Sequence, residues 1–327
     1  MMRHMVQRSR TAFAARWAVV GMAWLPNGSI ASPTEIPTED SLANQSTPEA
    51  MARKCGFPIL SPAPWRDDDA GERSATPVSF ELRESFQIVV RGAIGPFAGL
   101  RFLIDTGSIP SMVDRQIARR LGVGVQDSRL VAFGEKTHIL SSVLPCIRLG
   151  PLRADAIAAG VGDLSFLHGV DAIIGLDVLS RSSFSIDYEA RQMSFGPMVS
   201  HAPTVRLEIN SPFLTVQLAI AGQPVRLLVD TGSKRLVLFE QRVRGRLPRL
   251  PVTGELVMYH ISGASKLRRV RLPPVSANGF AIERLEGFLS DAPVDGYPAE
   301  IDGVLGMRAL ARKGAEFDFE RGRLGFR

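Results

Sequence analysis

Cysteine and histidine are scarce in this chain of 327 residues, and their scarcity argues against whole classes of protein. Two cysteines, Cys55 and Cys146, are too few for the disulfide framework of a small secreted scaffold. The five histidines are scattered without metal-ligand spacing, and no glycine-rich loop that would cradle a phosphate is present. We therefore expect neither a metal nor a cofactor.

Long hydrophobic runs are also lacking. The apolar run over residues 17–25 is too short to span a bilayer comfortably. Arginines precede this run, and the small-residue site Ser29-Ile30-Ala31 follows it, which is typical of a secretory signal peptide. We predict a signal peptide over residues 1–31, export to the periplasm or medium, and no stable membrane span after its removal. The alternatives are an uncleaved membrane anchor, a misassigned start and a disordered tail.

Lysine is rare as well: it supplies 5 of the 39 basic residues, so the net charge of +6 comes from arginine. We interpret this excess as genome composition rather than as a ligand site. The densest basic run, residues 266–271, alternates in part with apolar residues and fits the exposed face of a strand. No aromatic residues interleave with it, so we expect no nucleic-acid partner.

The apolar content of 45% is that of a soluble globular protein, and the length suits about two domains of about 150 residues. Residues 32–77 are rich in Pro, Ser, Thr and Glu, which indicates a flexible linker or a pro-segment. The remaining chain is divided into lobe 1, residues 78–199, and lobe 2, residues 200–327. In an oxidising compartment Cys55 and Cys146 would pair; two separate thiols are the alternative.

One tetrapeptide occurs twice, as Asp105-Thr106-Gly107-Ser108 and as Asp230-Thr231-Gly232-Ser233. Each copy directly follows an apolar run that is typical of a buried strand. A single copy would be read as a turn, because Asp and Gly are both turn formers. Two copies in matched surroundings indicate a pair of acids that meet.

The repeat extends downstream. The segment around Gly175 matches the segment around Gly306, and residues 185–189 match residues 316–320. The two acids lie 125 residues apart and the two glycines 131 residues apart. This period is too long for a solenoid and indicates two homologous lobes.

These motifs resemble the aspartic protease superfamily, and residues 102–123 and 172–188 resemble the retropepsin-like proteases of bacteria especially closely. The resemblance covers residues 80–327. It implies a mainly β, bilobal acid-protease fold of two pseudo-twofold-related retropepsin-like lobes, like a retropepsin dimer fused into one chain. Such a chain would work as a monomer. Short helices are expected over residues 113–121, 176–181 and 307–313.

The resemblance implies that Asp105 and Asp230 form a catalytic dyad. Two carboxyl groups about 3 Å apart share one proton, so together they supply the base and the acid that peptide hydrolysis requires. The neighbouring residues would support them: Thr106 and Thr231 by hydrogen bonds across the lobe interface, Gly107 and Gly232 by bringing backbone amides close, and Ser108 and Ser233 by donating to the outer carboxylate oxygens. Gly175 and Gly306 are expected to be structural.

Two further acids, Asp187 and Asp318, sit at the ends of apolar strands. We interpret them as structural acids rather than additional catalytic ones, because the dyad already has two carboxylates.

Each lobe is also expected to supply a flap, a hairpin that closes over the substrate. The candidates are residues 130–140, turning near Gly134-Glu135-Lys136, and residues 255–267, turning near Gly263 within residues 262–264. Pepsin-like enzymes carry a tyrosine on the first flap, which is absent here, and Tyr259 on the second is the nearest substitute. Ordinary surface hairpins are the alternative.

The sequence therefore predicts an aspartic endopeptidase that takes an extended peptide or protein substrate. Ile109, Met112 and Leu236, beside the acids, would favour hydrophobic side chains around the scissile bond. The alternative is a catalytically weak or inactive module of the same fold that binds a peptide or an envelope protein. Two intact copies of the tetrapeptide favour the enzyme, because binding alone does not need a proton-sharing pair.

Overall fold

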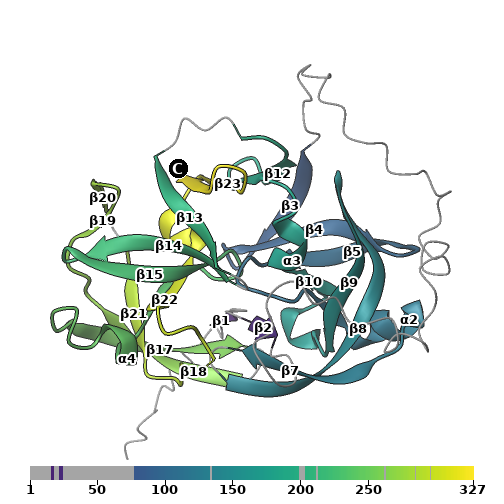
Figure 1. The fold of residues 1–327 in the computed structure, drawn as a ribbon, viewed down its shortest axis with the longest axis horizontal. Coiled ribbons are helices and arrows are strands. Elements are labelled where there is room, and N and C mark those ends of the chain that lie inside the picture. Colours follow the sequence, from purple (N-terminus) through teal and green to yellow (C-terminus); the bar gives the residue numbers. More distant parts are fainter. Residues whose placement is uncertain are drawn as a thin grey trace, which may run out of the picture.

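The computed structural model of the chain describes most of residues 77–327 and two short segments near the N-terminus (Figure 1). The described ranges are 16–17, 22–24, 77–132, 135–198, 203–210, 213–260, 263–283, 285–294 and 296–327. The predicted linker or pro-segment lies outside them, apart from residue 77, and so does Cys55. Its expected partner Cys146 is buried in lobe 1. No helix among the described residues is long and apolar enough to cross a membrane.

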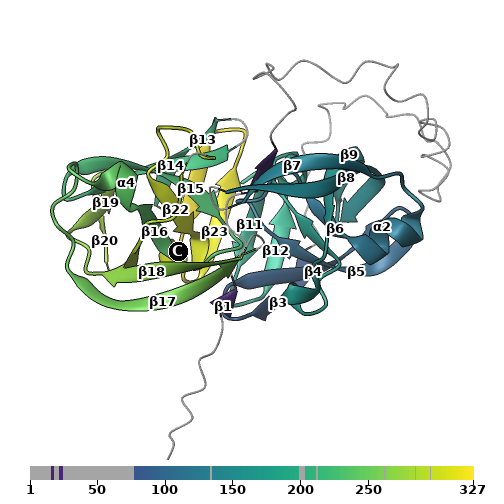
Figure 2. The same cartoon turned by 90° about the horizontal axis from the view of Figure 1, so that it is seen from below.

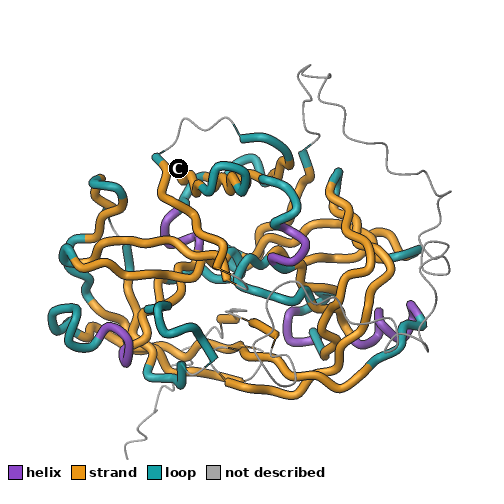
Figure 3. Tube along the Cα trace, viewed as in Figure 1, coloured by secondary structure: helices purple, strands orange, loops and turns teal. Residues whose placement is uncertain are grey.

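Strands dominate both halves of the molecule, and the helices are short (Figure 3). The elements of lobe 1 are β4 (Gln87–Ile94), β5 (Phe97–Ile104), β6 (Met112–Asp114), α2 (Arg115–Leu121), β7 (Gln126–Ala132), β8 (Glu135–Leu149), β9 (Leu152–Gly162), the 3₁₀ turn η2 (Ser165–Leu167), β10 (Ala172–Ile174) and α3 (Leu176–Leu179). The elements of lobe 2 are β14 (Phe213–Ile220), β15 (Gln223–Asp230), β16 (Leu236–Phe239), α4 (Glu240–Val243), β17 (Val252–His260), β18 (Gly263–Val270), β19 (Val275–Ala277), β20 (Phe280–Ile282), β21 (Gly287–Ser290), β22 (Gly303–Gly306) and α5 (Met307–Leu310).

The two lobes share one pairing scheme, as the repeat predicts. In lobe 1, β10 pairs parallel with β5 and antiparallel with β6. In lobe 2, β22 pairs parallel with β15 and antiparallel with β16. Equivalent acids stabilise both arrangements: the Arg101 amide donates to Asp171 at 2.8 Å, and the Arg226 amide donates to Asp302 at 2.9 Å. The predicted mainly β, bilobal fold is confirmed.

A third sheet joins the lobes (Figure 2). Its strands, in spatial order, are β3 (Val78–Arg83), β12 (Gln192–Phe195), β11 (Phe184–Asp187), β23 (Gly314–Asp318), β24 (Arg323–Phe326) and β13 (Thr204–Asn210). At its centre β11 pairs antiparallel with β23, so the two copies of the third repeat element lie directly beside each other. Phe184 stacks on Phe317 there, with ring centroids 4.5 Å apart.

Two further strands come from the predicted signal peptide. Strand β1 (Arg16–Trp17) pairs parallel with β17, and β2 (Met22–Trp24) pairs antiparallel with β7. The sequence predicts an apolar run here but gives no indication that it pairs with the lobes.

The three predicted helices are present, in shorter form, and α4 is additional. Helix α2 begins at Arg115 rather than Val113, because the Asp114 side chain caps it by accepting from the Gln116 amide at 2.8 Å. It ends at Gly122, whose backbone is left-handed with φ 62°. The basic run of residues 266–271 lies largely on β18, where Lys266 pairs with Glu255 at 3.0 Å and Arg268 pairs with Glu240.

Candidate active site

Asp105 and Asp230 lie where two equivalent strands end. Asp105 directly follows β5, and its amide donates to the Ile174 carbonyl of β10 at 3.0 Å. Asp230 is the last residue of β15 and pairs in register with Gly306 of β22. Both acids have 0% of their surface exposed. The shared pairing scheme of the lobes therefore delivers both carboxyl groups to the interface between them.

The two carboxyl groups interact directly, and each changes the pKa of the other. On the inner side, the Gly107 amide donates to Asp105 Oδ1 at 2.9 Å, and the Gly232 amide donates to Asp230 Oδ1 at 2.6 Å. No donor among the described residues reaches the buried Oδ2 atom of either acid. Because an ionised carboxylate only accepts, a bond between the two groups requires that one carries a proton.

Burial raises the pKa of both acids, because a charged carboxylate is poorly solvated there. The pKa of Asp105 rises from 3.8 to about 7, opposed by its hydrogen bonds to Asp230 and to the backbone amides of Gly107, Gly232 and Ser108. The pKa of Asp230 rises well above the usual value, first through burial and then through the charge of Asp105. Both shifts disfavour the doubly ionised state of the pair.

Thr106 and Thr231 interlock the two loops. The Thr106 amide donates to Thr231 Oγ1 at 3.0 Å, and the Thr231 amide donates to Thr106 Oγ1 at 3.1 Å. Each hydroxyl in turn donates to a strand of the opposite lobe: Thr106 to the Val229 carbonyl at 2.9 Å, and Thr231 to the Ile104 carbonyl at 3.0 Å. Four buried hydrogen bonds thus fix the positions of the loops that carry the acids.

Gly107 and Gly232 each lie against the carboxyl group of the opposite lobe. A Cβ atom on Gly107 would lie 2.7 Å from Asp230 Cγ, and one on Gly232 would lie 2.7 Å from Asp105 Cγ. No side chain fits at that distance, so the close approach of the two acids requires glycine at both positions.

The predicted roles of the Ser108 and Ser233 hydroxyls were wrong. Ser108 Oγ donates to the Pro110 carbonyl at 3.1 Å, and Ser233 Oγ accepts from the Arg235 amide at 3.5 Å. Neither hydroxyl reaches the outer carboxylate oxygens. The serine backbone amides, rather than the hydroxyls, oppose the rise in the acids' pKa.

Gly175 and Gly306 lie directly behind the two loops. A Cβ atom on Gly175 would lie 2.3 Å from the Ser108 carbonyl oxygen, and one on Gly306 would lie 2.4 Å from the Arg235 nitrogen. At both positions two backbone segments pass so close together that a side chain would not fit between them. The role of both glycines is therefore structural.

A buried acid that the sequence did not single out anchors the first loop. Asp177 accepts from the Ser111 hydroxyl at 2.7 Å and from the Ser111 amide at 3.0 Å, while the Gly175 amide donates to Ser111 Oγ at 2.9 Å. Burial raises the pKa of Asp177, and its hydrogen bonds to Ser111 oppose that rise. The equivalent residue of lobe 2, Arg308, stacks on the ring of Tyr188 instead. The sequence does contain a sign of this role: the two copies of the repeat differ at this position, with Asp177 in the first and Arg308 in the second.

Asp187 and Asp318 both stabilise turns. Asp187 accepts from the Glu189 amide at 2.9 Å and from the Ala190 amide at 2.8 Å, while Asp318 accepts from the Arg321 amide at 3.0 Å. These contacts agree with the prediction that both acids are structural rather than catalytic.

Both flap candidates are hairpins, but their turns differ from the predicted positions. Strand β7 pairs with β8 up to Ala132 and Glu135, so Glu135 and Lys136, predicted as part of the first turn, already belong to β8. Gly134 lies outside the described residues. Strand β17 pairs with β18 up to His260 and Gly263. The prediction placed the second turn over residues 262–264, which is too late, because Gly263 and Ala264 already belong to β18. The backbone of Tyr259 lies on β17 opposite Ala264.

Tyr297 was also missed by the sequence analysis. It is buried in the core of lobe 2, stacked on Phe239 with ring centroids 4.9 Å apart. Burial, and secondarily the charge of Asp230, raise the pKa of its phenol, so the hydroxyl stays protonated.

The expected hydrophobic contacts beside the acids are only partly available. Leu236 is completely buried in the core. Met112 lines a cavity of about 360 Å³ at the base of the first flap, together with residues that include Ile139 and His138.

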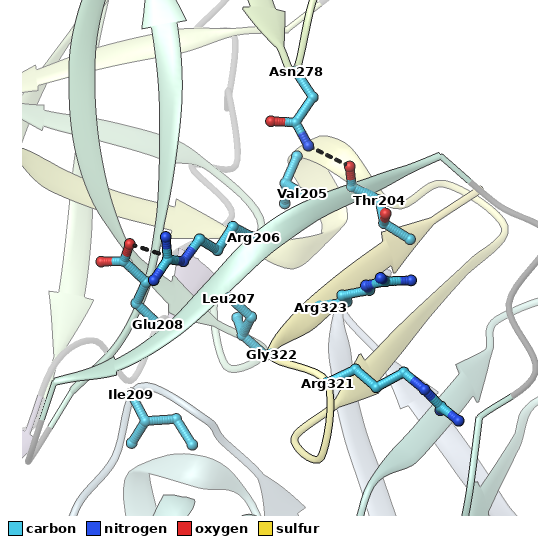
Figure 4. Close-up of a pocket in the computed structure, with 10 residues that line it drawn as sticks. All are labelled: Thr204, Val205, Arg206, Leu207, Glu208, Ile209, Asn278, Arg321, Gly322 and Arg323. Carbon is cyan, nitrogen blue, oxygen red and sulfur yellow. Dashed lines mark hydrogen bonds and ion pairs between the residues drawn. The ribbon is translucent and has the colours of Figure 1, made fainter.

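A larger cavity, of about 760 Å³, lies elsewhere, along β13 and the turn between β23 and β24 (Figure 4). It is lined by Thr204, Val205, Arg206, Leu207, Glu208, Ile209, Asn278, Arg321, Gly322 and Arg323. Glu208 is the one acid among these ten residues, and Arg206 pairs with it at 3.4 Å. This cavity therefore offers no paired carboxyl groups. The described residues also contain no group of three His, Cys, Asp or Glu side chains that could hold a metal ion.

Comparison with known families agrees with the duplication. A family model described as aspartyl protease matches the chain twice, over residues 90–178 and 216–309, which together make up more than half of its length. The first match contains Asp105 and Gly175, and the second contains Asp230 and Gly306. No curated protein matches the chain significantly.

Proposed function

Because the chain belongs to the aspartyl protease family, we propose that it is an endopeptidase in which Asp105 and Asp230 activate one water molecule between two retropepsin-like lobes. The observation that carries this proposal is the placement of the two buried carboxyl groups side by side, each against the Asp-Thr-Gly loop of the opposite lobe. Acids that serve only structure, such as Asp187 and Asp318, accept from nearby turn amides instead.

The chemistry follows from the shared proton. In the singly protonated pair, one carboxyl group is ionised and the other holds the proton. The ionised group takes a proton from water as the water oxygen attacks the peptide carbonyl carbon, and the protonated group gives its proton to the carbonyl oxygen. The tetrahedral intermediate then collapses: the group that took the proton from water gives it to the leaving nitrogen as the C–N bond breaks, and a hydroxyl of the intermediate returns its proton to the other group, so that a carboxylic acid and an amine are released and the pair again holds one proton.

The flap hairpins support an extended peptide as substrate. One edge of β7 pairs with β8, and one edge of β17 pairs with β18. The opposite edge of each strand can accept a further strand, because a strand offers hydrogen-bonding groups on both sides. A peptide lying between the lobes would add to both hairpins, with its central bond facing the dyad.

The proposal is tested with the full chain carrying Asp105→Asn or Asp230→Asn, incubated with an unfolded protein and a peptide library between pH 4 and pH 8. Each substitution keeps the shape of the side chain and removes one of the two proton-transfer groups. We expect each to lower the cleavage rate at least 1,000-fold, an order of magnitude consistent with losing the general acid or base.

Asp155→Asn is the matched control, because Asp155 is exposed and pairs only with Arg153 on the surface. It should cleave like the unsubstituted chain. Cleavage that survives either dyad substitution would contradict the shared-dyad mechanism. If the unsubstituted chain binds peptides without cutting them, the binding-module alternative is correct.

A further inference from the structure

The charge of the chain is divided unevenly between the lobes. Residues 78–199 contain 12 Lys and Arg against 12 Asp and Glu, and residues 1–77 contain 8 of each, whereas residues 200–327 contain 19 against 13. The net charge of +6 therefore falls on lobe 2 alone. A compositional preference for arginine would raise the charge of both lobes, so it does not account for this division.

Two of the basic side chains of lobe 2, Arg235 and Arg269, lie over the same aromatic ring. Their guanidinium carbons are 5.3 Å and 5.8 Å from the centroid of the Phe288 ring. Strand β21, which carries Phe288, pairs on one side with β16, which directly follows Arg235, and on the other with β18, which carries Arg269. A guanidinium stacks through its face while its N–H donors lie in its plane, so a stacked arginine can also bind a carboxylate.

The ring between these arginines belongs to the buried cluster that adjoins the dyad. Phe288 shares this cluster with Tyr297, whose phenol has its pKa raised by burial and secondarily by the charge of Asp230. Ile109, from the loop that carries the other acid, packs against the same cluster from lobe 1. Arg235 itself lies in the loop that follows Asp230. The two arginines are therefore placed between the dyad and the base of the second flap.

The equivalent positions of lobe 1 are small and uncharged. Strand register and the spacing from each dyad acid give the equivalences: Gly160 replaces Phe288, Ser141 replaces Arg269, and Pro110 replaces Arg235. Lobe 1 instead has the cavity of about 360 Å³ at the base of its flap. The two halves of the cleft thus offer different surfaces, an open cavity in lobe 1 and two stacked cations in lobe 2.

We propose that Arg235 and Arg269 form a subsite for an acidic side chain of the peptide. This inference rests on the proposed function, because it takes the surface between the dyad and the second flap to be part of the substrate cleft. A Glu or Asp side chain in the subsite would accept charge-assisted hydrogen bonds from the guanidinium groups, whose planar donors match a carboxylate. Because lobe 1 lacks these charges, the acidic side chain also fixes the direction in which the peptide lies across the dyad.

The test uses full-length chains carrying Asp105→Asn, so that peptides bind without being cut. The probes are decapeptides with two central leucines, prepared in pairs that have either Glu or Gln at one of the other positions, and their dissociation constants are compared at pH 7. Arg235→Gln and Arg269→Gln each remove one charge from the subsite. Arg206→Gln is the matched control, because Arg206 belongs to the same lobe but lies on β13 with 83% of its side chain exposed.

We expect Glu to improve binding about tenfold over Gln at a position on one side of the central leucines only, as one charge-assisted hydrogen bond would. Arg235→Gln and Arg269→Gln should each remove most of this preference and still bind the Gln peptide normally, whereas Arg206→Gln should retain it. Arg269→Glu should reverse it, so that Lys binds better than Gln at that position. Equal binding of Glu and Gln at every position, or an equal loss with Arg206→Gln, would overturn the inference.

The two proposals fail separately when Asp105 is restored. If the peptides bind with the charge preference but are never cleaved, the protease function fails while the subsite stands. If Glu and Gln peptides are cleaved with equal kcat/KM at every position, the subsite fails while the function stands. A chain that binds none of the peptides would contradict both.

Discussion

Thr106 and Thr231 bind each other reciprocally across the lobe interface, each donating its amide to the other's hydroxyl, at 3.0 and 3.1 Å. Each hydroxyl also donates to a carbonyl of the opposite lobe, so each hydroxyl both accepts and donates one buried hydrogen bond. This interlock sets the distance between the two acids, because Asp105 and Asp230 are the residues immediately before the threonines.

Thr106→Val should therefore destabilise the chain and slow cleavage together. Valine keeps the shape but leaves the Thr231 amide and the Val229 carbonyl buried without a partner, which costs about 2–4 kcal/mol of unfolding free energy. Urea unfolding and peptide cleavage measure the two effects. Thr106→Ser retains the hydroxyl and should recover most of both. A valine variant as stable and as active as the unsubstituted chain would show that the interlock does not position the acids.

Gly107→Ala should damage the site by steric contact alone. The added Cβ atom would lie 2.7 Å from Asp230 Cγ, so the carboxyl group must move away from Asp105. We expect a loss of at least 100-fold in cleavage rate and of about 1–3 kcal/mol in unfolding free energy. Gly124→Ala is the matched control, because its Cβ atom would have no atom within 4 Å. Similar behaviour of the two variants would contradict the close contact.

The buried dyad should make the fold less stable as the pH rises. The folded pKa of Asp105, about 7, lies above the unfolded value of 3.8, so between these values the folded chain binds a proton that the unfolded chain has released. Its contribution to stability is complete below pH 3.8 and is lost as the pH rises through 7. The loss is up to about 1.4 kcal/mol per pH unit.

Urea unfolding at pH 4, 5, 6 and 7 measures this slope. The pKa values of Asp230, Asp171 and Asp177 are also raised, so these acids add to the slope of the unsubstituted chain. Asp105→Asn removes the contribution of Asp105 together with the effect of its charge on the pKa of Asp230, and should give a shallower slope. Identical slopes would mean that Asp105 titrates at its usual pKa in the folded chain.

The sequence predicted those features that depend on a repeated local pattern. The duplicated tetrapeptide with its apolar strand predicts the two lobes, because the period and the strand ends follow directly from residue order. The interactions of the Ser108 and Ser233 hydroxyls were not predictable in this way. A hydroxyl has several acceptors within reach, and the backbone geometry of the turn decides that Ser108 donates to Pro110.

Partners far apart in the sequence were also not predictable. The pairing of β1 with β17 joins residues more than 200 positions apart, and the sequence of neither segment indicates which strand it will pair with. Tyr297 likewise lies in an irregular stretch with no periodicity, so only the folded lobe brings it beneath Phe239 and near Asp230.

Asp177 provides the last test, because it acts on the dyad only through Ser111. Its carboxylate accepts from the Ser111 amide and hydroxyl, and this serine in turn accepts from the Gly175 amide, behind the Asp105 loop. Asp177→Ala leaves two buried donors of Ser111 without a partner, so we expect a loss of about 2–4 kcal/mol in unfolding free energy. The loop that carries Asp105 should loosen, and kcat should fall while KM changes little, because the flap edges that bind the peptide are untouched. Asp155→Ala removes an exposed carboxylate and should change neither quantity. A rise in KM at constant kcat would instead place the effect of Asp177 on peptide binding rather than on the positioning of the dyad.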